Sequence, residues 1–293
     1  MGHAMATEQL NQLHIFSRQD MTCPHYCSIA GGSVGLFSAR SPAKETDNED
    51  AAAILSVDDK RAVLAVADGL GGHLAGAEAA ELALRALVKS IQTELDCVTD
   101  QPNLRTAILN GFETANRDVT ALGVGAGTTL AALEIDGNTA RTYHVGDTEI
   151  LIVGQRGKNH HQTVSHSPVG YAVEAGLLNE KEAIEHKDRH IVSNIVGSED
   201  MRIEIGPVVK IRPRDTIVLA SDGLFDNLRL SEIINLVRKG PLIKVVQQVS
   251  KLCQDRMVNP QESHPSKPDD LTLLVYRPDQ IASRKKSSNS RHN

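Results

Sequence analysis

The sequence lacks an excess of basic residues, a long apolar run and a dense set of cysteines. Its 293 residues carry a formal charge of −6, which argues against a nucleic-acid partner because backbone phosphates favour clustered Lys and Arg. No run of about twenty apolar residues would span a membrane, and no charged segment precedes a short apolar one as in a secretory signal. We therefore expect a soluble, cytoplasmic protein with no membrane partner.

The cysteines are few and scattered. They lie at positions 23, 27, 97 and 253, which favours reduced thiols over a disulfide framework. Cys23 and Cys27 flank His25 as metal ligands would, but nothing elsewhere completes a tetrahedral zinc set with the usual spacing, so we assign no zinc site. A hydrophobic content of 40% is adequate for a substantial core, and no repeat or linker divides the chain.

The chain is organised around an apolar run that starts at Val63 and ends at Asp68. Glycines follow at 69, 71 and 72, so the pattern predicts a buried strand that stops at the carboxylate and then turns tightly, exposing its carbonyls. The same pattern, an apolar run followed by an aspartate and a glycine, recurs in the run that ends at Asp222. Asp269-Asp270 precede a further apolar strand. Three strands that each deliver a carboxylate predict a shared site for Mg²⁺ or Mn²⁺, which prefer oxygen ligands.

The remaining periodicity predicts an α+β fold with mainly antiparallel sheets. A strand at 51–57 and the central strand form a hairpin through the turn at 58–60, and the Gly/Ser-rich stretch 29–39 predicts an edge strand with turns. Amphipathic patterns predict two long consecutive helices. The predicted helices are 75–95, 102–119, 231–238 and 241–254, and the further predicted strands are 129–135, 139–145, 150–153, 203–209, 216–220 and 271–276.

Three segments are expected to differ from this core. Residues 1–12 are polar and begin Met-Gly-His-Ala-Met, which is typical of a cloning remnant, so the single domain is expected to span 13–278. Residues 165–190 combine glycines, acids and three histidines without a long apolar face, which predicts a mobile surface excursion. The Ser/Arg/Lys-rich residues 279–293 predict a disordered tail.

Six ordered motifs together resemble the metal-dependent, type 2C class of serine/threonine protein phosphatases, in its bacterial form. Because one Asp-Gly turn is ordinary chemistry, the order and spacing carry the resemblance, which runs from about residue 48 to 276. The motifs are Asn-Glu-Asp (48–50), Ala-Asp-Gly-Leu-Gly-Gly-His (67–73), Gly-Thr-Thr (127–129), Val-Gly-Asp (145–147), Ser-Asp-Gly-Leu-Phe-Asp (221–226) and Asp-Asp-Leu-Thr (269–272).

The resemblance implies a fold and a reaction. The fold would be two packed antiparallel sheets, each covered by a helix pair, with 165–190 as a flap beside the active site. The reaction would be hydrolysis of phosphoserine or phosphothreonine in a protein substrate by a water between two Mn²⁺ or Mg²⁺ ions, with no covalent nucleophile. A cognate serine/threonine kinase is the expected counterpart.

The resemblance also implies residue roles. Asp68 would bridge both ions, and the Gly69 carbonyl would bind one of them. Asp222 and Asp269 would hold the other. Asp269 is preferred to Asp270 because Thr272 lies three residues after it, which is the spacing in the family pattern. Asp50, with Glu49 nearby, would orient water, and Asp147 would join Asp222 around a third, weaker ion.

Two positions depart from the family pattern. Leu70 stands where eukaryotic members often have a histidine that is a candidate general acid, and His73 is kept as an alternative acid. Glu45 stands where an arginine usually clamps the phosphate in a bidentate fork. Arg40 or Lys44 would have to reach the phosphate instead, and we favour Arg40.

Several polar residues have simpler interpretations. Asp136 and Asp226 fit ordinary turns, and Thr128 and Thr129 fit structural strand positions near the site. His144 fits a satisfied core or surface histidine. The histidines at 160, 161, 166, 186 and 190 are assigned to solvated loops.

Two other functions stay open at this point. One is a catalytically silent relative that uses the fold as a binding or regulatory module, although several unpaired carboxylates at one spot would repel one another without metal. The other is a metal phosphohydrolase that acts on small phosphate esters.

Overall fold

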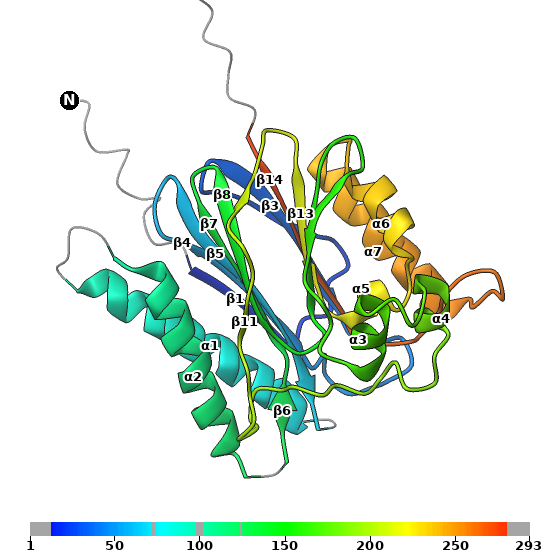
Figure 1. Cartoon of the computed structure of the whole chain (residues 1–293), viewed down its shortest axis with the longest axis horizontal. Coiled ribbons are helices and arrows are strands. Elements are labelled where there is room, and N and C mark those ends of the chain that lie inside the picture. The colour runs from blue at the N-terminus through cyan, green and yellow to red at the C-terminus, as the bar shows by residue number, and fades with distance from the viewer. Residues whose placement is uncertain (1–12, 72–73, 98–101, 124, 280–293) are drawn as a thin grey trace, which may run out of the picture.

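The computed structural model describes residues 13–71, 74–97, 102–123 and 125–279 (Figure 1). Their strands form two sheets, and the ladders within both are antiparallel. The first sheet contains, in spatial order, β1 (Leu13–Ser17), β4 (Asp50–Ser56), β5 (Arg61–Leu70), β7 (Leu130–Asp136), β8 (Thr139–Val145) and β11 (Glu204–Ile205), with β12 (Val209–Lys210) also on β8 and β6 (Gly127–Thr128) on β5.

The second sheet packs against the first. Its spatial order is β10 (Asn159–Gln162), β9 (Glu149–Val153), β13 (Thr216–Ala220), β14 (Leu271–Pro278), β3 (Gly32–Ala39) and β2 (His25–Ile29). Two long helices, α1 (Leu74–Asp96) and α2 (Leu104–Thr120), cover the outer face of the first sheet, and α6 (Leu230–Val237) and α7 (Leu242–Val258) cover that of the second (Figure 1). The predicted sandwich with a helix pair on each sheet is therefore confirmed.

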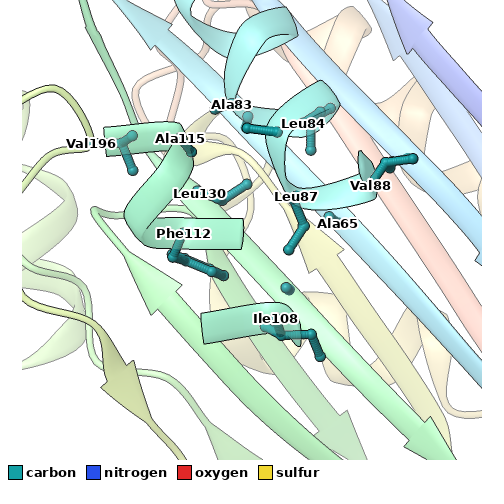
Figure 2. Close-up of a cluster of buried hydrophobic side chains, with 14 of the residues drawn as sticks. Ala65, Ala83, Leu84, Leu87, Val88, Ile108, Phe112, Ala115, Leu130 and Val196 are labelled. Atoms are coloured by element: carbon teal, nitrogen blue, oxygen red, sulfur yellow. The ribbon is translucent and has the colours of Figure 1, made fainter. Parts of the chain in front are cut away.

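Strand alternation explains why the sandwich has three apolar layers. In β5, Val63 and Ala65 pack toward α1 and α2, whereas Leu64 and Val66 pack between the two sheets, as period-two side chains must. Figure 2 shows the outer layer, where Leu84 and Leu87 of α1 meet Phe112 of α2 over the sheet. Since β5 is apolar on both faces, a charge can lie only near its ends.

The structure corrects three expectations about the strands. The central strand does not stop at Asp68, because Gly69 and Leu70 continue it by pairing with β6. β3 is an interior strand between β14 and β2, and its glycines serve close packing, since a Cβ on Gly35 would lie 2.7 Å from the Tyr26 ring. The predicted strand at 203–209 is replaced by the two short pieces β11 and β12.

The segment 165–190 contains two short helices, α3 (Pro168–Glu174) and α4 (Glu180–Ile184). Ser167 caps α3 by accepting a hydrogen bond from the Gly170 N–H, and Asn179 with Glu182 forms a capping box on α4. These caps account for helices that lack a long apolar face. Among the described residues, no helix combines the length and the apolar composition that crossing a bilayer requires.

Candidate active site: a carboxylate cluster between the two sheets

The cluster starts from two acids on neighbouring strands. Asp68 follows Leu64 and Val66 on the inter-sheet side of β5, and the β4–β5 register places Asp50 directly opposite it. Asp50 is only 1% exposed. Burial raises the pKa of both carboxyls well above their ordinary value, and the charge of Asp50 raises that of Asp68 further.

The second sheet supports this pair through Ser221. Its hydroxyl donates to Asp50 Oδ2 at 2.7 Å and accepts from the Thr272 N–H at 3.1 Å. The Ser221 N–H donates to the Thr272 carbonyl, so the ends of β13 and β14 are joined at the point where they meet β4. Ser221 is fully buried and ties the two sheets together at the acids.

Three further carboxylates come from loops at the same end of the sandwich. Asp147 follows β8, Asp222 is the first residue of the short helix α5 (Asp222–Phe225), and Asp269 precedes β14. Burial and the charge of Asp222 raise the pKa of Asp147 to about 8 and that of Asp269 to about 6. Charges on Asp222, Asp269 and Asp147 also act on Asp68, so the structure brings together all five predicted carboxylates.

Gly69 lets the strand end pack against the start of α1. A Cβ at this position would lie 2.2 Å from the Gly76 carbonyl oxygen and 2.8 Å from that of Glu49, so no larger residue fits. The Asp68 carbonyl accepts from the Thr128 hydroxyl and the Thr129 N–H, both at 2.8 Å. The two threonines are therefore structural, as expected.

Asp270 and Asp269 have different surroundings. Asp270 accepts from the Ser41 N–H through Oδ1 and from the Glu49 N–H through Oδ2, both at 2.7 Å. Both carboxylate oxygens of Asp270 are therefore engaged by backbone N–H groups of the loop that precedes β4. Asp269 accepts the Asp270 N–H through Oδ1 at 2.9 Å and leaves 35% of its side chain exposed.

Two lysines contact the acids. Lys44 Nζ lies 2.7 Å from Glu49 Oε2 and 2.5 Å from Asp270 Oδ2. Lys267 Nζ lies within 3.0 Å of three carboxylates, those of Asp222, Asp226 and Asp269. Lys267 was not predicted from the sequence, although it lies only two residues before Asp269, and Asp226 lies in a turn, as predicted, where it also pairs with Lys267.

Arg40 does not contact these acids. Its guanidinium pairs with Asp20 at 3.1 Å and donates to the Glu45 carbonyl at 3.0 Å, with 42% of the side chain exposed. Leu70 is the last residue of β5, and His73 lies outside the described residues.

His166 was wrongly assigned to a solvated loop, because it is only 4% exposed and stacks on His144 with ring centroids 4.3 Å apart. Together with Glu204 this pair has the spacing of a metal site. His166 Nδ1, however, accepts the Gly146 N–H at 3.0 Å, so the proton lies on Nε2, which faces Glu204. Neither ring nitrogen of His166 then offers a lone pair to a metal, and the group is structural.

The carboxylate cluster does fit divalent cations. Asp50 Oδ1 and Glu49 Oε1 are buried and have no hydrogen-bond partner. Buried acids that raise one another's pKa are stabilised by a cation, and oxygen-only donors suit Mg²⁺ and Mn²⁺. Asp50, Asp68, Asp147, Asp222, Asp269 and the backbone at Gly69 would supply the ligands.

Comparisons with known proteins identify the family of this chain. A family described as protein phosphatase 2C matches residues 40–261. The protein phosphatase PhpP of Streptococcus pneumoniae serotype 2 is 34% identical over 202 residues, which cover 66% of this chain and 80% of that protein. The solved serine/threonine phosphatase of S. agalactiae has a TM-score of 0.70 at 28% identity and covers 83% of this chain and 98% of its own.

A more distant solved structure shows the same fold. It is the catalytic domain of the phosphatase PstP in complex with two manganese ions, with a TM-score of 0.63 at 21% identity over 92% of this chain and 100% of that one. The sandwich is thus the fold of bacterial serine/threonine phosphatases. This chain belongs to the protein phosphatase 2C family, and it is a protein serine/threonine phosphatase.

Proposed function

We propose that this chain hydrolyses phosphoserine and phosphothreonine in proteins with water at a pair of divalent ions. The carrying observation is the convergence of Asp50, Asp68, Asp147, Asp222 and Asp269 where the two sheets meet. When bound, two Mn²⁺ or Mg²⁺ ions would lower the pKa of a water and neutralise charge on the phosphoryl oxygens. The manganese pair in the PstP structure supports this choice of metals.

The residue roles are assigned from the family motifs, and the positions of the acids support them. Asp68, on which the charges of the other four acids act, would bridge the ions, with the Gly69 carbonyl as a further ligand of one. Asp222 and Asp269, from α5 and the start of β14, would hold the other ion. Asp147 would share a third, weaker ion with Asp222.

Asp50 is placed to orient water. Its Oδ2 is fixed by the Ser221 hydroxyl, and its buried Oδ1 is left to accept a further hydrogen bond. A carboxylate that is fixed at one oxygen and open at the other holds a water without losing its own orientation. Glu49, with its own unpartnered oxygen, would assist from the adjacent position.

Lys44 is better placed than Arg40 to hold the phosphate. Its ammonium pairs with Glu49 and Asp270, the chain neighbours of Asp50 and Asp269, whereas Arg40 pairs with Asp20, which is not next to any of the five acids. A lysine binds phosphate as a point charge and lacks the bidentate fork of arginine. We therefore expect weak ground-state affinity for phosphoprotein. The substrate would be supplied by a cognate serine/threonine kinase in the cytoplasm.

Hydrolysis assays with the full chain test this function. We would compare a phosphothreonine peptide, p-nitrophenyl phosphate and a nucleotide, each with millimolar Mn²⁺ and with EDTA. Asp222→Ala should abolish Mn²⁺-dependent turnover, and Asp136→Ala, at an exposed turn, should not. Faster nucleotide turnover would identify a small-ester hydrolase. No turnover with any metal would identify a silent binding module.

A further inference from the structure

Lys267 is an unusual neighbour for acids that would bind metal. Its Nζ lies 2.6 Å from Asp222 Oδ2, 2.8 Å from Asp226 Oδ2 and 3.0 Å from Asp269 Oδ2. An ammonium has three donors, and here three carboxylates from two separate segments surround it. The Lys267 ammonium therefore occupies the position at which a cation shared by Asp222 and Asp269 would bind.

The placement of Lys267 is built into the fold. Its N–H donates to Asn227 Oδ1 at 2.9 Å, and its carbonyl accepts from Asn227 Nδ2 at 2.8 Å. Asn227 is fully buried and also donates to the Gly223 carbonyl in α5. The buried amide thus fixes the lysine backbone relative to the helix that carries Asp222, and only 20% of the lysine side chain is exposed.

We propose that Lys267 is an internal counterion that competes with one of the two divalent ions. The ammonium neutralises part of the charge on Asp222, Asp226 and Asp269 when metal is absent. A divalent ion held by Asp222 and Asp269 has to displace it, because the ammonium occupies Oδ2 of both carboxylates. Among the described residues, the lysine ion pairs at the site are those of Lys267 and of Lys44 with Glu49 and Asp270, and neither lysine pairs with Asp68, so the ion on the Asp68–Gly69 side should meet no ammonium on its main ligand.

This inference rests on the proposed function, since it takes Asp222 and Asp269 as ligands of a common ion. Its consequences concern binding and stability, however, and can be measured without substrate. The lysine should make one Mn²⁺ affinity much weaker than the other, and it should protect the metal-free protein from repulsion among its acids.

Calorimetric titration of the metal-free full chain with Mn²⁺ tests the competition. Lys267→Met removes the charge and keeps much of the length, so the weaker Mn²⁺ site should tighten by about tenfold or more, while the tighter site changes little. Lys267→Arg keeps the charge and should keep the weak site weak. Lys251→Met, at an exposed position of α7, is the matched control and should bind as the wild type does.

Thermal unfolding tests the counterion role. In EDTA, Lys267→Met should unfold a few degrees below the wild type, because the three acids then repel without compensation, and Mn²⁺ should remove the difference. Wild-type affinities in Lys267→Met would overturn the competition. An unchanged or higher melting temperature in EDTA would overturn the counterion role.

A measurement on the unaltered chain covers the case in which the variants do not fold. Amine acetylation followed by mass spectrometry should modify Lys267 faster in saturating Mn²⁺ than in EDTA, because the displaced ammonium loses its carboxylate partners. Equal rates would overturn the proposal. If the wild type hydrolyses phosphopeptide but Lys267→Met has wild-type Mn²⁺ affinities, only the role proposed for Lys267 is refuted. If Lys267→Met binds Mn²⁺ more tightly but the wild type shows no hydrolysis, only the proposed reaction is refuted.

Discussion

Asp50 and Asp68 are direct partners in the antiparallel register of β4 and β5, and both carboxyls lie on the side that faces the second sheet. Two acids in this position are unfavourable without a cation, since burial raises the pKa of both and the charge of Asp50 raises that of Asp68 further. A sheet made only for stability would place an apolar pair there, as β5 does at its other inter-sheet positions. The pairing is therefore best explained by a cation.

The first prediction concerns Asp68→Asn. It removes the bridging charge, so Mn²⁺-dependent hydrolysis should fall by at least about a hundredfold, a loss that even supporting groups around a metal can cause. The fold should be retained, and in EDTA the variant should be more stable than the wild type because Asp50 no longer faces a like charge. Phosphopeptide kinetics and thermal unfolding measure the two effects.

Asp136→Asn is the control for this substitution, because Asp136 is the exposed last residue of β7 and its replacement should change neither quantity. Retained turnover in Asp68→Asn, at Mn²⁺ concentrations that saturate the wild type, would refute the bridging role.

The second prediction concerns Ser221→Ala. The change removes the donor to Asp50 and the acceptor of the Thr272 N–H, leaving two buried groups unpaired. The free energy of unfolding should fall by about 1–3 kcal/mol. Mn²⁺ affinity should fall by about tenfold or more, as it does when a group that orients a ligand is lost. Urea unfolding and calorimetry measure these losses.

Ser250→Ala provides the comparison, because Ser250 is also buried but bonds only to the Gln247 carbonyl within α7, at 3.3 Å. It should leave Mn²⁺ affinity unchanged. If both serine variants bind Mn²⁺ equally well, Ser221 serves packing alone.

The layers of the fold were readable from the sequence because strand and helix periods are local properties. The runs at 63–67, 150–153 and 217–220 are apolar throughout and therefore predict buried strands, and α1 and α2 follow from their apolar stripes. What the sequence concealed depends on tertiary partners. Gly69 and Leu70 look like a turn until β6 pairs with them, and the glycines of β3 look like an edge until Tyr26 packs on them.

The site residues likewise fall into those that sequence patterns reveal and those that depend on tertiary contacts. Asp68, Asp222 and Asp269 were found because each ends or precedes an apolar run, which is a one-dimensional signal, and Asp50 and Asp147 were found through the family motifs. Lys267 and the structural role of His166 were missed because each is defined by contacts between residues far apart in the chain, as with the Gly146 N–H that donates to His166. Arg40 was favoured by residue type alone, which cannot reveal that Asp20 engages it.

The third prediction separates Lys44 from Arg40. Lys44→Met should raise the KM for a phosphothreonine peptide by about tenfold, the change expected for losing one charged contact to phosphate. Arg40→Met should change the KM little, because its guanidinium pairs with Asp20 at the surface. The inhibition constant of inorganic phosphate should weaken in parallel in Lys44→Met. A larger KM increase in Arg40→Met would reverse the assignment.

The last prediction uses the ion pair that supports the lysine-bearing loop. Arg256, only 8% exposed, donates to Glu232 through Nη2 at 2.6 Å and through Nη1 at 3.1 Å, and Nη1 also donates to the Asn227 carbonyl at 2.7 Å. Hydrogen bonds from Arg256 hold the pKa of Glu232 below its ordinary value of 4.5. Through Asn227, this pair therefore supports the position of Lys267.

A lowered folded-state pKa means that the native chain binds the proton less tightly than the unfolded chain does. The stabilisation by Glu232 is therefore complete above the unfolded pKa and disappears as the pH falls through the lower folded value. Glu232→Gln should reduce the free energy of unfolding by about 1–3 kcal/mol at pH 7, with the difference vanishing in acid. Urea unfolding across this pH range measures it, with exposed Glu262→Gln as the control. A difference that stays constant down to pH 3 would show that Glu232 acts through packing and not through its charge.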